Sequence, residues 1–157
     1  MSDPISGPHL VVLGAGFAAL STVREVRKHD RHVRITVIAP RAELHYLPGI
    51  IWIPCGLRAR EDLVVPLHNF FQRMNVQFIQ AEVQGLAEQG RVVLTTAGPV
   101  RNDALVIATG GRFIKKLPGI EHAITPCEGI AAAEQIRDRL KAMQGGHIAI
   151  GFAGNPN

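Results

Sequence analysis

The residues best suited to chemistry in this chain form a short group of glycines and alanines near its start. The motif reads Gly14-Ala15-Gly16-Phe17-Ala18-Ala19 and directly follows the apolar run of residues 9–13. Glycines at this spacing allow a tight turn from a strand into a helix and let the backbone approach phosphate groups. Free N–H groups and the positive end of the helix dipole then attract the anion. The motif predicts a pyrophosphate site; a turn that only packs a helix on a sheet is the alternative.

The residue that usually holds a ribose is missing after these glycines. Dinucleotide-binding units carry an acid about 20 residues further on, whereas residues 37–41 read Val-Ile-Ala-Pro-Arg and offer only Ala39 and Arg41. An arginine without the acid can bind a 2′-phosphate, so these residues leave NADP, NAD and FAD open. A solvated loop charge is the alternative for Arg41.

A second candidate for chemistry is Cys127, which precedes a predicted helix that begins near Ile130. A thiol at the positive end of a helix ionises more readily, and the thiolate is the nucleophile. An inert buried cysteine is the alternative. The other cysteine, Cys55, has no assigned role, and because neither cysteine has metal-ligand spacing we expect no metal site.

A strand–helix–strand pattern positions the glycine motif. Apolar strands are predicted at His9–Leu13 and at 33–38, with an amphipathic helix between them. A further strand at 104–108 runs into Ala108-Thr109-Gly110-Gly111, a turn at a strand's carboxyl end, where α/β sheets place their ligands. The predicted fold is therefore α/β, a Rossmann-like doubly wound parallel sheet.

The rest of the chain predicts further elements and a second domain that is cut short. We expect helices at 65–75 and 130–143, short strands at 76–80, 83–86 and 91–96 in a small antiparallel excursion, and a strand at 147–150. Residues 151–154 look like a second nucleotide turn, but the chain ends at Asn157. We expect a dinucleotide-binding domain at 1–125 and the start of another at 126–157. The nearly uncharged loop 44–57 needs an apolar cover, either a ring system or another protein segment, and core packing is the alternative.

Composition limits the function classes. With 46% hydrophobic and 19% charged residues among 157, the chain is expected to be globular. Its net charge of +4 is spread without a basic block, which argues against nucleic-acid binding. No signal peptide or membrane span is recognised, so we expect a cytoplasmic protein. An incomplete sheet would leave an open edge, which makes a homo-oligomer plausible.

The sequence resembles the flavoproteins with two dinucleotide domains, and among them the sulfide:quinone oxidoreductase group and its flavocytochrome relatives. The resemblance covers nearly the whole chain. The matching features are Gly14-Ala15-Gly16, the non-acidic Ala39, the loop 44–54, the pair Glu61-Asp62, the turn Ala108-Thr109-Gly110, and Cys127 ahead of a helix. Relatives normally carry another cysteine just after the second glycine turn, where this chain has Asn155-Pro156-Asn157.

The resemblance implies a bound FAD and a role for each candidate residue. Gly14, Gly16, Phe17 and Ala18 would surround the pyrophosphate, Ala39 and Arg41 the ribose, Val83 the adenine and Pro48 the flavin ring, while Ala108, Thr109 and Gly110 would close the site. Cys127 would be a redox-active cysteine that helps to bind and release sulfur. Electrons would pass from a sulfur donor to a quinone or cytochrome, with peripheral membrane association through segments not present here. A flavoprotein that oxidises NAD(P)H, such as a type II NADH dehydrogenase or a disulfide reductase, and a catalytically silent nucleotide-binding fragment are the alternatives.

Overall fold

The computed structural model describes residues 7–111 and 118–151 in two compact units. Unit 1 comprises residues Met1–His45 and Val65–Gly111, and unit 2 comprises Tyr46–Val64 and Arg112–Asn157. We describe each unit by itself. The domain border expected at residue 125 stays a prediction.

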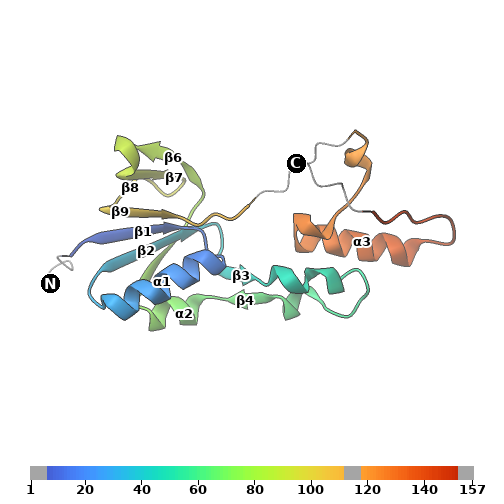
Figure 1. The fold of residues 1–157 in the computed structure, drawn as a ribbon, viewed down its shortest axis with the longest axis horizontal. Helices are drawn as coiled ribbons and strands as arrows, with labels where there is room; N and C mark the ends of the chain where they lie inside the picture. Colours follow the sequence, from blue (N-terminus) through green and yellow to red (C-terminus); the bar gives the residue numbers. More distant parts are fainter. Residues whose placement is uncertain (1–6, 112–117, 152–157) are drawn as a thin grey trace. The chain divides into compact units, whose positions relative to one another are not determined.

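A four-stranded parallel sheet forms the centre of unit 1 (Figure 1). Its strands are β1 (His9–Leu13), β2 (Arg34–Ala39), β5 (Val76–Gln80) and β9 (Ala104–Ile107), in the order β5-β2-β1-β9. All five residues of β1 are buried, because this central strand is paired on both edges and covered on both faces. The predicted α/β class with a Rossmann-like parallel sheet is confirmed.

Alternating residues of β1 serve the two faces of the sheet. Leu10 and Val12 pack in one cluster with the buried side of α1 (Phe17–His29) and with α2 (His68–Arg73). Val11 and Leu13 pack in another cluster with Val93. This second face carries a three-stranded antiparallel sheet made of β6 (Val83–Ala87), β7 (Val92–Thr95) and β8 (Val100–Arg101). Figure 1 shows the two helices and the antiparallel sheet on opposite sides of the parallel sheet. The expected antiparallel excursion is present.

Two sequence-based expectations about unit 1 were wrong in detail. Residues 76–80 do not join the antiparallel excursion, because they pair in parallel with β2 and form the edge strand β5. The helix expected from residue 65 starts only at His68, because residues 64–66 form strand β4 (Val64–Pro66), which pairs with β3 (Glu43–His45). Val65 precedes a proline, and that position disfavours helical backbone.

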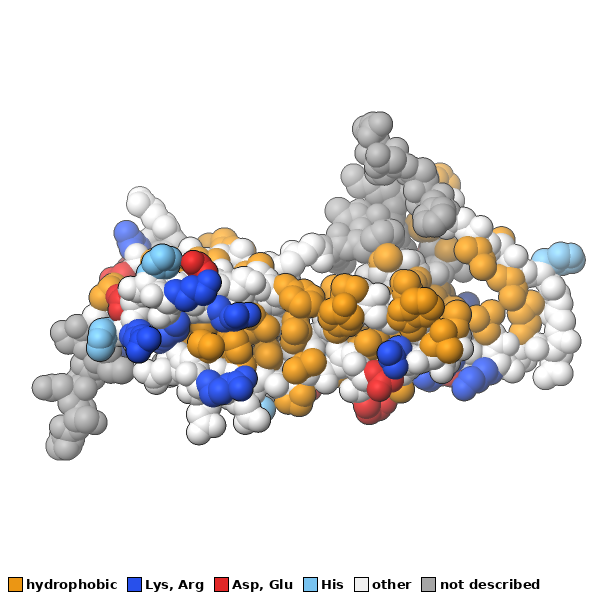
Figure 2. Space-filling model, turned by 60° about the horizontal axis from the view of Figure 1, so that its bottom comes forward, with side chains coloured by type: hydrophobic (Ala, Val, Ile, Leu, Met, Phe, Trp, Pro, Cys, Tyr) orange, Lys and Arg blue, Asp and Glu red, His pale blue; other side chains and the backbone are white. Residues whose placement is uncertain are grey.

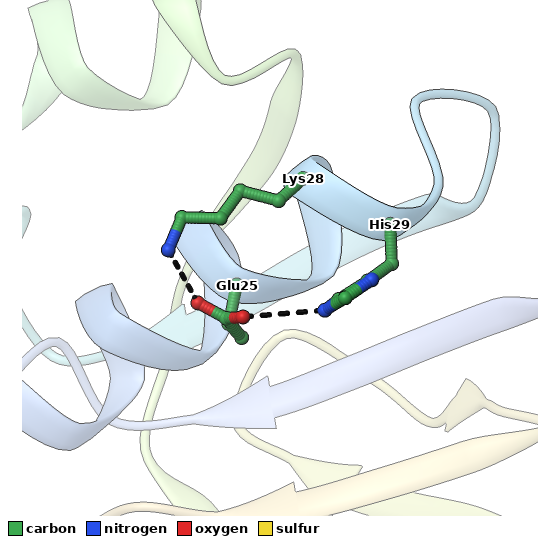
Figure 3. Close-up of polar contacts among 3 residues, drawn as sticks. All are labelled: Glu25, Lys28 and His29. Atoms are coloured by element: carbon green, nitrogen blue, oxygen red, sulfur yellow. Dashed lines mark hydrogen bonds and ion pairs between the residues drawn. The ribbon is translucent and has the colours of Figure 1, made fainter.

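Arg27 holds the end of α1 in place, and Glu25 and Lys28 form an exposed ion pair on the same helix. The guanidinium of Arg27 donates to the carbonyl oxygens of Met74 (2.8 Å), Val33 (2.7 Å) and Asn75 (2.9 Å). These bonds hold the helix end against the chain entering β2 and the end of α2. Glu25 lies between Lys28 and His29, at 2.7 and 3.2 Å (Figure 3). Its pKa is lowered mainly by the hydrogen bond from Lys28.

Unit 2 is built from short turns and one longer helix. It contains the 3-10 helices η1 (Leu47–Trp52), η2 (Arg60–Asp62), η4 (Ile120–His122) and η5 (Pro126–Glu128), followed by α3 (Ile130–Ala142). Ile50, Ile53 and Leu63 pack with Ile130 and Ala133 of α3 in its core. The strand expected at 147–150 is not formed: Ile150 is 93% exposed, and within 7–111 and 118–151 no strand pairs with these residues. Residues 152–157, including most of the expected second glycine turn, lie outside the described part.

Candidate functional site

The turn after β1 has a geometry that only glycine satisfies at its first position. Gly14 has a φ of +103°, and its N–H donates to the carbonyl oxygen of Ile38 at 2.8 Å. A Cβ atom at this position would lie 2.3 Å from the carbonyl oxygen of Ala108. The turn after β1 and the turn after β9 are therefore in direct backbone contact, and the absence of a side chain at Gly14 makes that contact possible.

The second glycine opens the start of α1 to solvent. Gly16 is the N-cap of α1 with extended backbone, and a Cβ added there would have no neighbour within 4 Å. Gly16, Phe17 and Ala18 are exposed. No acidic side chain lies in the first turn of α1, whose leading N–H groups have no partner within the helix. Ala19 is fully buried in the core cluster, so the helix packs closely on the sheet behind an open, positive helix end.

Three of the predicted segments meet at one edge of the sheet because their strands are parallel. Gly14 follows β1, Ala39 ends β2, and Ala108 follows β9, so all three lie at carboxyl ends of neighbouring strands. The N–H of Ala108 donates to the carbonyl oxygen of Leu13 at 2.9 Å, which extends the pairing of β1 and β9 to the turn. Gly110 has a φ of +80°, which favours glycine.

The strand order also marks this edge as a place for a ligand. The chain leaves β1 toward β2 on one side and returns to β9 on the other side. Loops that diverge in this way leave a crevice outside the carboxyl ends of the strands. The glycine turn and the Ala108–Gly110 turn border that position, so the residues present fit a pyrophosphate group.

The segment after β2 contains an acid that the sequence reasoning did not single out. Ala39 is buried, and Arg41 faces Glu43, with 3.5 Å between the arginine Nε and the carboxylate. His45 approaches the same carboxylate at 3.3 Å. Arg41 is thus held by Glu43 as well as facing solvent. A signal was present in the sequence: Glu43 stands shortly after the second strand, but outside the position where the motif places its acid.

Val83 begins β6 and lies opposite Thr95 of β7. The preceding segment is attached to the end of β2, because the N–H of Ala81 donates to the carbonyl oxygen of Ala39 at 3.1 Å. The side chain of Val83 is 39% exposed. Backbone pairing therefore places the segment that leads to Val83 beside the carboxyl end of β2.

Pro48 belongs to unit 2, where it lies in η1 and lines a pocket. The other lining residues are Tyr46, Gly49, Trp52, Arg58, Asp62 and Leu63. Large apolar side chains remain exposed around it, among them Leu47, Ile51 and Trp52. Figure 2 shows hydrophobic side chains gathered on the surface of this unit. The loop 44–57 thus exposes apolar side chains that a cover would bury, while Ile50 and Ile53 pack in the core of unit 2, as the alternative of core packing expected.

Cys127 also belongs to unit 2, in the 3-10 turn η5 immediately before α3. Cys127 is exposed, and its backbone N–H donates to the Thr125 hydroxyl oxygen at 3.3 Å. Gly129, with a φ of +116°, separates the turn from Ile130 at the start of α3. The alternative of a buried cysteine is therefore wrong. Cys55 is exposed as well.

The described residues contain neither a metal-ligand group nor a membrane-spanning helix. Within 7–111 and 118–151, no three His, Cys, Asp or Glu side chains are grouped so that they could hold a metal ion. In the same part of the chain, no helix combines the length and the apolar character needed to cross a bilayer.

Comparison with known proteins identifies the family. The model of the pyridine nucleotide-disulphide oxidoreductase family matches residues 8–154. The chain belongs to this family. The family consists of FAD-dependent oxidoreductases, which agrees with the glycine turn and the strand order.

Within this family, the chain is similar to quinone-reducing enzymes of two kinds. A sulfide-quinone reductase of Aquifex aeolicus is 29% identical over 87% of this chain and 31% of its own length. A type II NADH:quinone oxidoreductase of Staphylococcus aureus is 33% identical over 71% of this chain and 28% of its own length. The crystal structure of the Aquifex sulfide:quinone oxidoreductase superimposes with a TM-score of 0.79 at 28% identity, covering 87% of this chain and 32% of that one. The chain thus spans about a third of the length of these relatives, and the resemblance drawn from the sequence is confirmed.

Proposed function

We propose that this chain forms the N-terminal, FAD-binding part of a flavin-dependent oxidoreductase that takes electrons from sulfide or a related sulfur compound and passes them to a quinone or cytochrome. The observation that carries the FAD site is the contact between the glycine turn and the turn after β9 at the switch point of the sheet. The likeness to the Aquifex sulfide-quinone reductase supports the donor.

In the proposed site, backbone groups and side chains contact different parts of the cofactor. The N–H groups at Gly16, Phe17 and Ala18, with the Gly14 turn, bind the pyrophosphate through the open start of α1. Ala39 and Arg41 flank the ribose, and Val83 lies toward the adenine. Ala108, Thr109 and Gly110 close the site, and Pro48 contacts the flavin ring. We add Glu43 as the acid that orients Arg41.

Cys127 is the proposed sulfur-binding residue. Its exposure in a turn leaves the thiol accessible to a small sulfur compound. When bound, FAD supplies the ring that accepts electrons from the donor and hands them to the acceptor. The contribution of this chain is to hold the pyrophosphate and to present the thiol.

One specific observation favours a second function, the oxidation of NADH by a type II NADH:quinone oxidoreductase. The Staphylococcus relative of that name is slightly more identical to this chain than the Aquifex relative, although over a shorter stretch. The two candidates differ in the electron donor, whereas the proposed FAD site serves both.

The FAD site is tested by mixing the purified chain with FAD, removing free flavin by desalting, and recording the visible spectrum. We expect retained flavin bands, because the backbone contacts of the site lie within unit 1. Gly16→Val should lose them, since it places a side chain where the phosphate must approach while leaving the fold room. Gly145→Val, at a turn with equally free space in unit 2, is the matched control. A colourless wild-type chain, or equal retention by both variants, would contradict the proposed site.

The donor is tested in a version of the protein extended to the length of its relatives. Anaerobic addition of sulfide should bleach the flavin absorbance, and NADH should not. Cys127→Ser should slow reduction by sulfide while leaving the amount of bound flavin unchanged. Reduction by NADH alone would replace the sulfide proposal by the NADH alternative. Bound flavin that neither donor reduces would favour the silent nucleotide-binding fragment.

A further inference from the structure

A pocket of unit 1 lies at the amino ends of the parallel strands, at the edge opposite the glycine turn. His9 is the first residue of β1 and Arg34 the first residue of β2. The pocket is lined by His9, Arg34, Glu88, Arg91, Arg101, Asn102 and Asp103. None of these residues takes part in the proposed FAD site.

The positive charges of this pocket exceed the negative charges that can neutralise them. Arg101 is paired, because both of its terminal nitrogens lie 2.9 Å from the Glu88 carboxylate. The guanidinium of Arg91 donates to a neutral acceptor, the backbone carbonyl of Asp103. The Asp103 carboxylate accepts the backbone N–H of His9 at 2.7 Å. Among the described residues, the Arg34 guanidinium has no hydrogen bond or ion pair.

The same pocket contains a buried nitrogen without a partner. His9 is only 7% exposed, and its Nε2 lies 2.8 Å from the Thr36 hydroxyl. Its Nδ1 is buried and makes no hydrogen bond with any described residue. A hydroxyl can donate or accept, so the Thr36 contact allows the tautomer that carries the proton on Nδ1. That N–H, like the Arg34 guanidinium, lacks an acceptor.

We propose that this pocket binds a small oxyanion of the phosphate class, which accepts hydrogen bonds from Arg34 and from Nδ1 of His9. Guanidinium and imidazole N–H groups are donors that suit such an anion, and the charge on Arg34 strengthens its bond. The bound anion joins the start of β1 to the start of β2, where His9 and Arg34 line the same pocket. The site is independent of the FAD site at the other edge of the sheet.

Ligand binding should be visible at His9 itself. Burial and the charge of Arg34 lower the pKa of His9, against smaller raising effects of the Arg101 backbone and the Asp103 carboxylate. An anion between Arg34 and His9 offsets the repulsion and raises that pKa. We would titrate the full chain with inorganic phosphate at constant ionic strength, using chloride to balance, and follow the His9 ring resonances by NMR. The expected result is a saturable shift together with a higher His9 pKa in phosphate than in chloride.

Matched variants separate this site from others. Arg34→Gln should weaken phosphate binding at His9 about tenfold or more, because a charge-assisted bond is lost. Arg34→Lys should keep part of the affinity, and Arg24→Gln, an exposed arginine on α1, should leave it unchanged. Unaltered β1 amide resonances would show that each variant is folded.

Gly16→Val distinguishes the two anion sites, since it should abolish binding at the start of α1 and leave the response of His9 intact. A response of His9 that does not saturate would overturn the proposal, and so would the same response in Arg34→Gln as in wild type. Phosphate that binds without moving the His9 resonances would also overturn it, while leaving the FAD proposal untouched.

Discussion

Unit 1 and unit 2 differ in the hydrophobic core that stabilises each of them. In unit 1 the central strand β1 is buried along its whole length, and core clusters cover both faces of its sheet. The described residues of unit 2 form one small core cluster, and Leu47 and Ile51 are more than half exposed. Its candidate residues, Pro48 and Cys127, lie on short exposed turns.

This difference separates a site made of backbone groups from a site made of exposed side chains. The pyrophosphate part of the candidate site in unit 1 consists of backbone groups whose positions follow from strand pairing, so folding alone places them. The candidates of unit 2 are side chains whose surroundings depend on what covers its apolar surface. A substitution at Gly14, where two turns are in contact, should therefore affect stability and ligand binding together, whereas substitutions at the exposed Pro48 and Cys127 should affect stability little.

The largest expected effect is that of Gly14→Ala. The new Cβ would lie 2.3 Å from the Ala108 carbonyl oxygen, and the residue would keep a positive φ. Strain and clash together should cost about 4 kcal/mol of unfolding free energy, measured by urea denaturation, and FAD should be lost. Gly16→Ala is the matched control: with open space at its Cβ it should cost less than about 1 kcal/mol. Equal costs for the two variants would show that the contact between the turns does not hold unit 1 together.

The next largest effect concerns the small core of unit 2. Ile53→Ala removes a fully buried side chain and should cost about 3 kcal/mol locally. Amide hydrogen exchange should accelerate in α3, which supplies Ile130 and Ala133 to the same core, and stay unchanged in β1. Ile51→Ala, two residues away but exposed, should change exchange little. Acceleration of exchange in β1 as well would mean that the two units unfold as one.

The sequence predicted the elements that local patterns determine. The glycine turn, the buried strand β1 and the helix after it follow from residue types within a single stretch of chain, and the structure has them. The excursion of short strands was also predicted, but residues 76–80 were assigned to the wrong sheet, because a short apolar strand does not reveal its pairing partner. The strand expected at 147–150 failed for a related reason: an apolar run needs a neighbouring strand, and none pairs with it.

The candidate site was predictable only in part. Gly14 and the turn at Ala108–Gly110 were recognisable because Gly14 and Gly110 have positive φ values that favour glycine, and Gly16 because it occupies the second glycine position of the motif. Direct contact between Gly14 and Ala108 was not, since these residues are far apart in the sequence and only the parallel pairing of β1 with β9 brings them together. The pairing of Arg41 with Glu43 depends on the path of the chain after β2, which no motif describes.

A smaller effect distinguishes two adjacent basic residues of α1. Arg27→Gln should destabilise unit 1 by about 2 kcal/mol, because four backbone carbonyls, that of Asp30 included, lose the fork of donors that joins α1 to the chain before β2 and after α2. Lys28→Gln breaks only the exposed pair with Glu25, which water screens, and should cost much less than Arg27→Gln. Thermal or urea unfolding of both variants checks the difference. Similar costs would mean that the clamp formed by Arg27 contributes no more than a surface charge.

The smallest expected effect is a pH dependence that belongs to unit 1. Since the pKa of His9 is lower in the folded chain than its ordinary value of 6.5, the unfolded chain binds more protons below about pH 6.5. The contribution of His9 to stability should therefore be present above about pH 6.5 and be lost progressively as the pH falls from there toward 5. This window is separate from the acidic range in which Glu25 and Asp30, whose pKa values are also lowered, take up protons.

His9→Gln tests this origin, because an amide can still bond Thr36 but does not titrate. Urea unfolding monitored by exchange of β1 amides in chloride buffer should show a shallower pH dependence in the variant than in wild type between pH 7.5 and 5. An unchanged slope would place the titrating group elsewhere. A reduced slope would assign the loss of stability at low pH to His9, at the amino end of β1. Added phosphate should then restore stability to the wild-type chain but not to Arg34→Gln, because the anion stabilises the protonated ring only where Arg34 holds it.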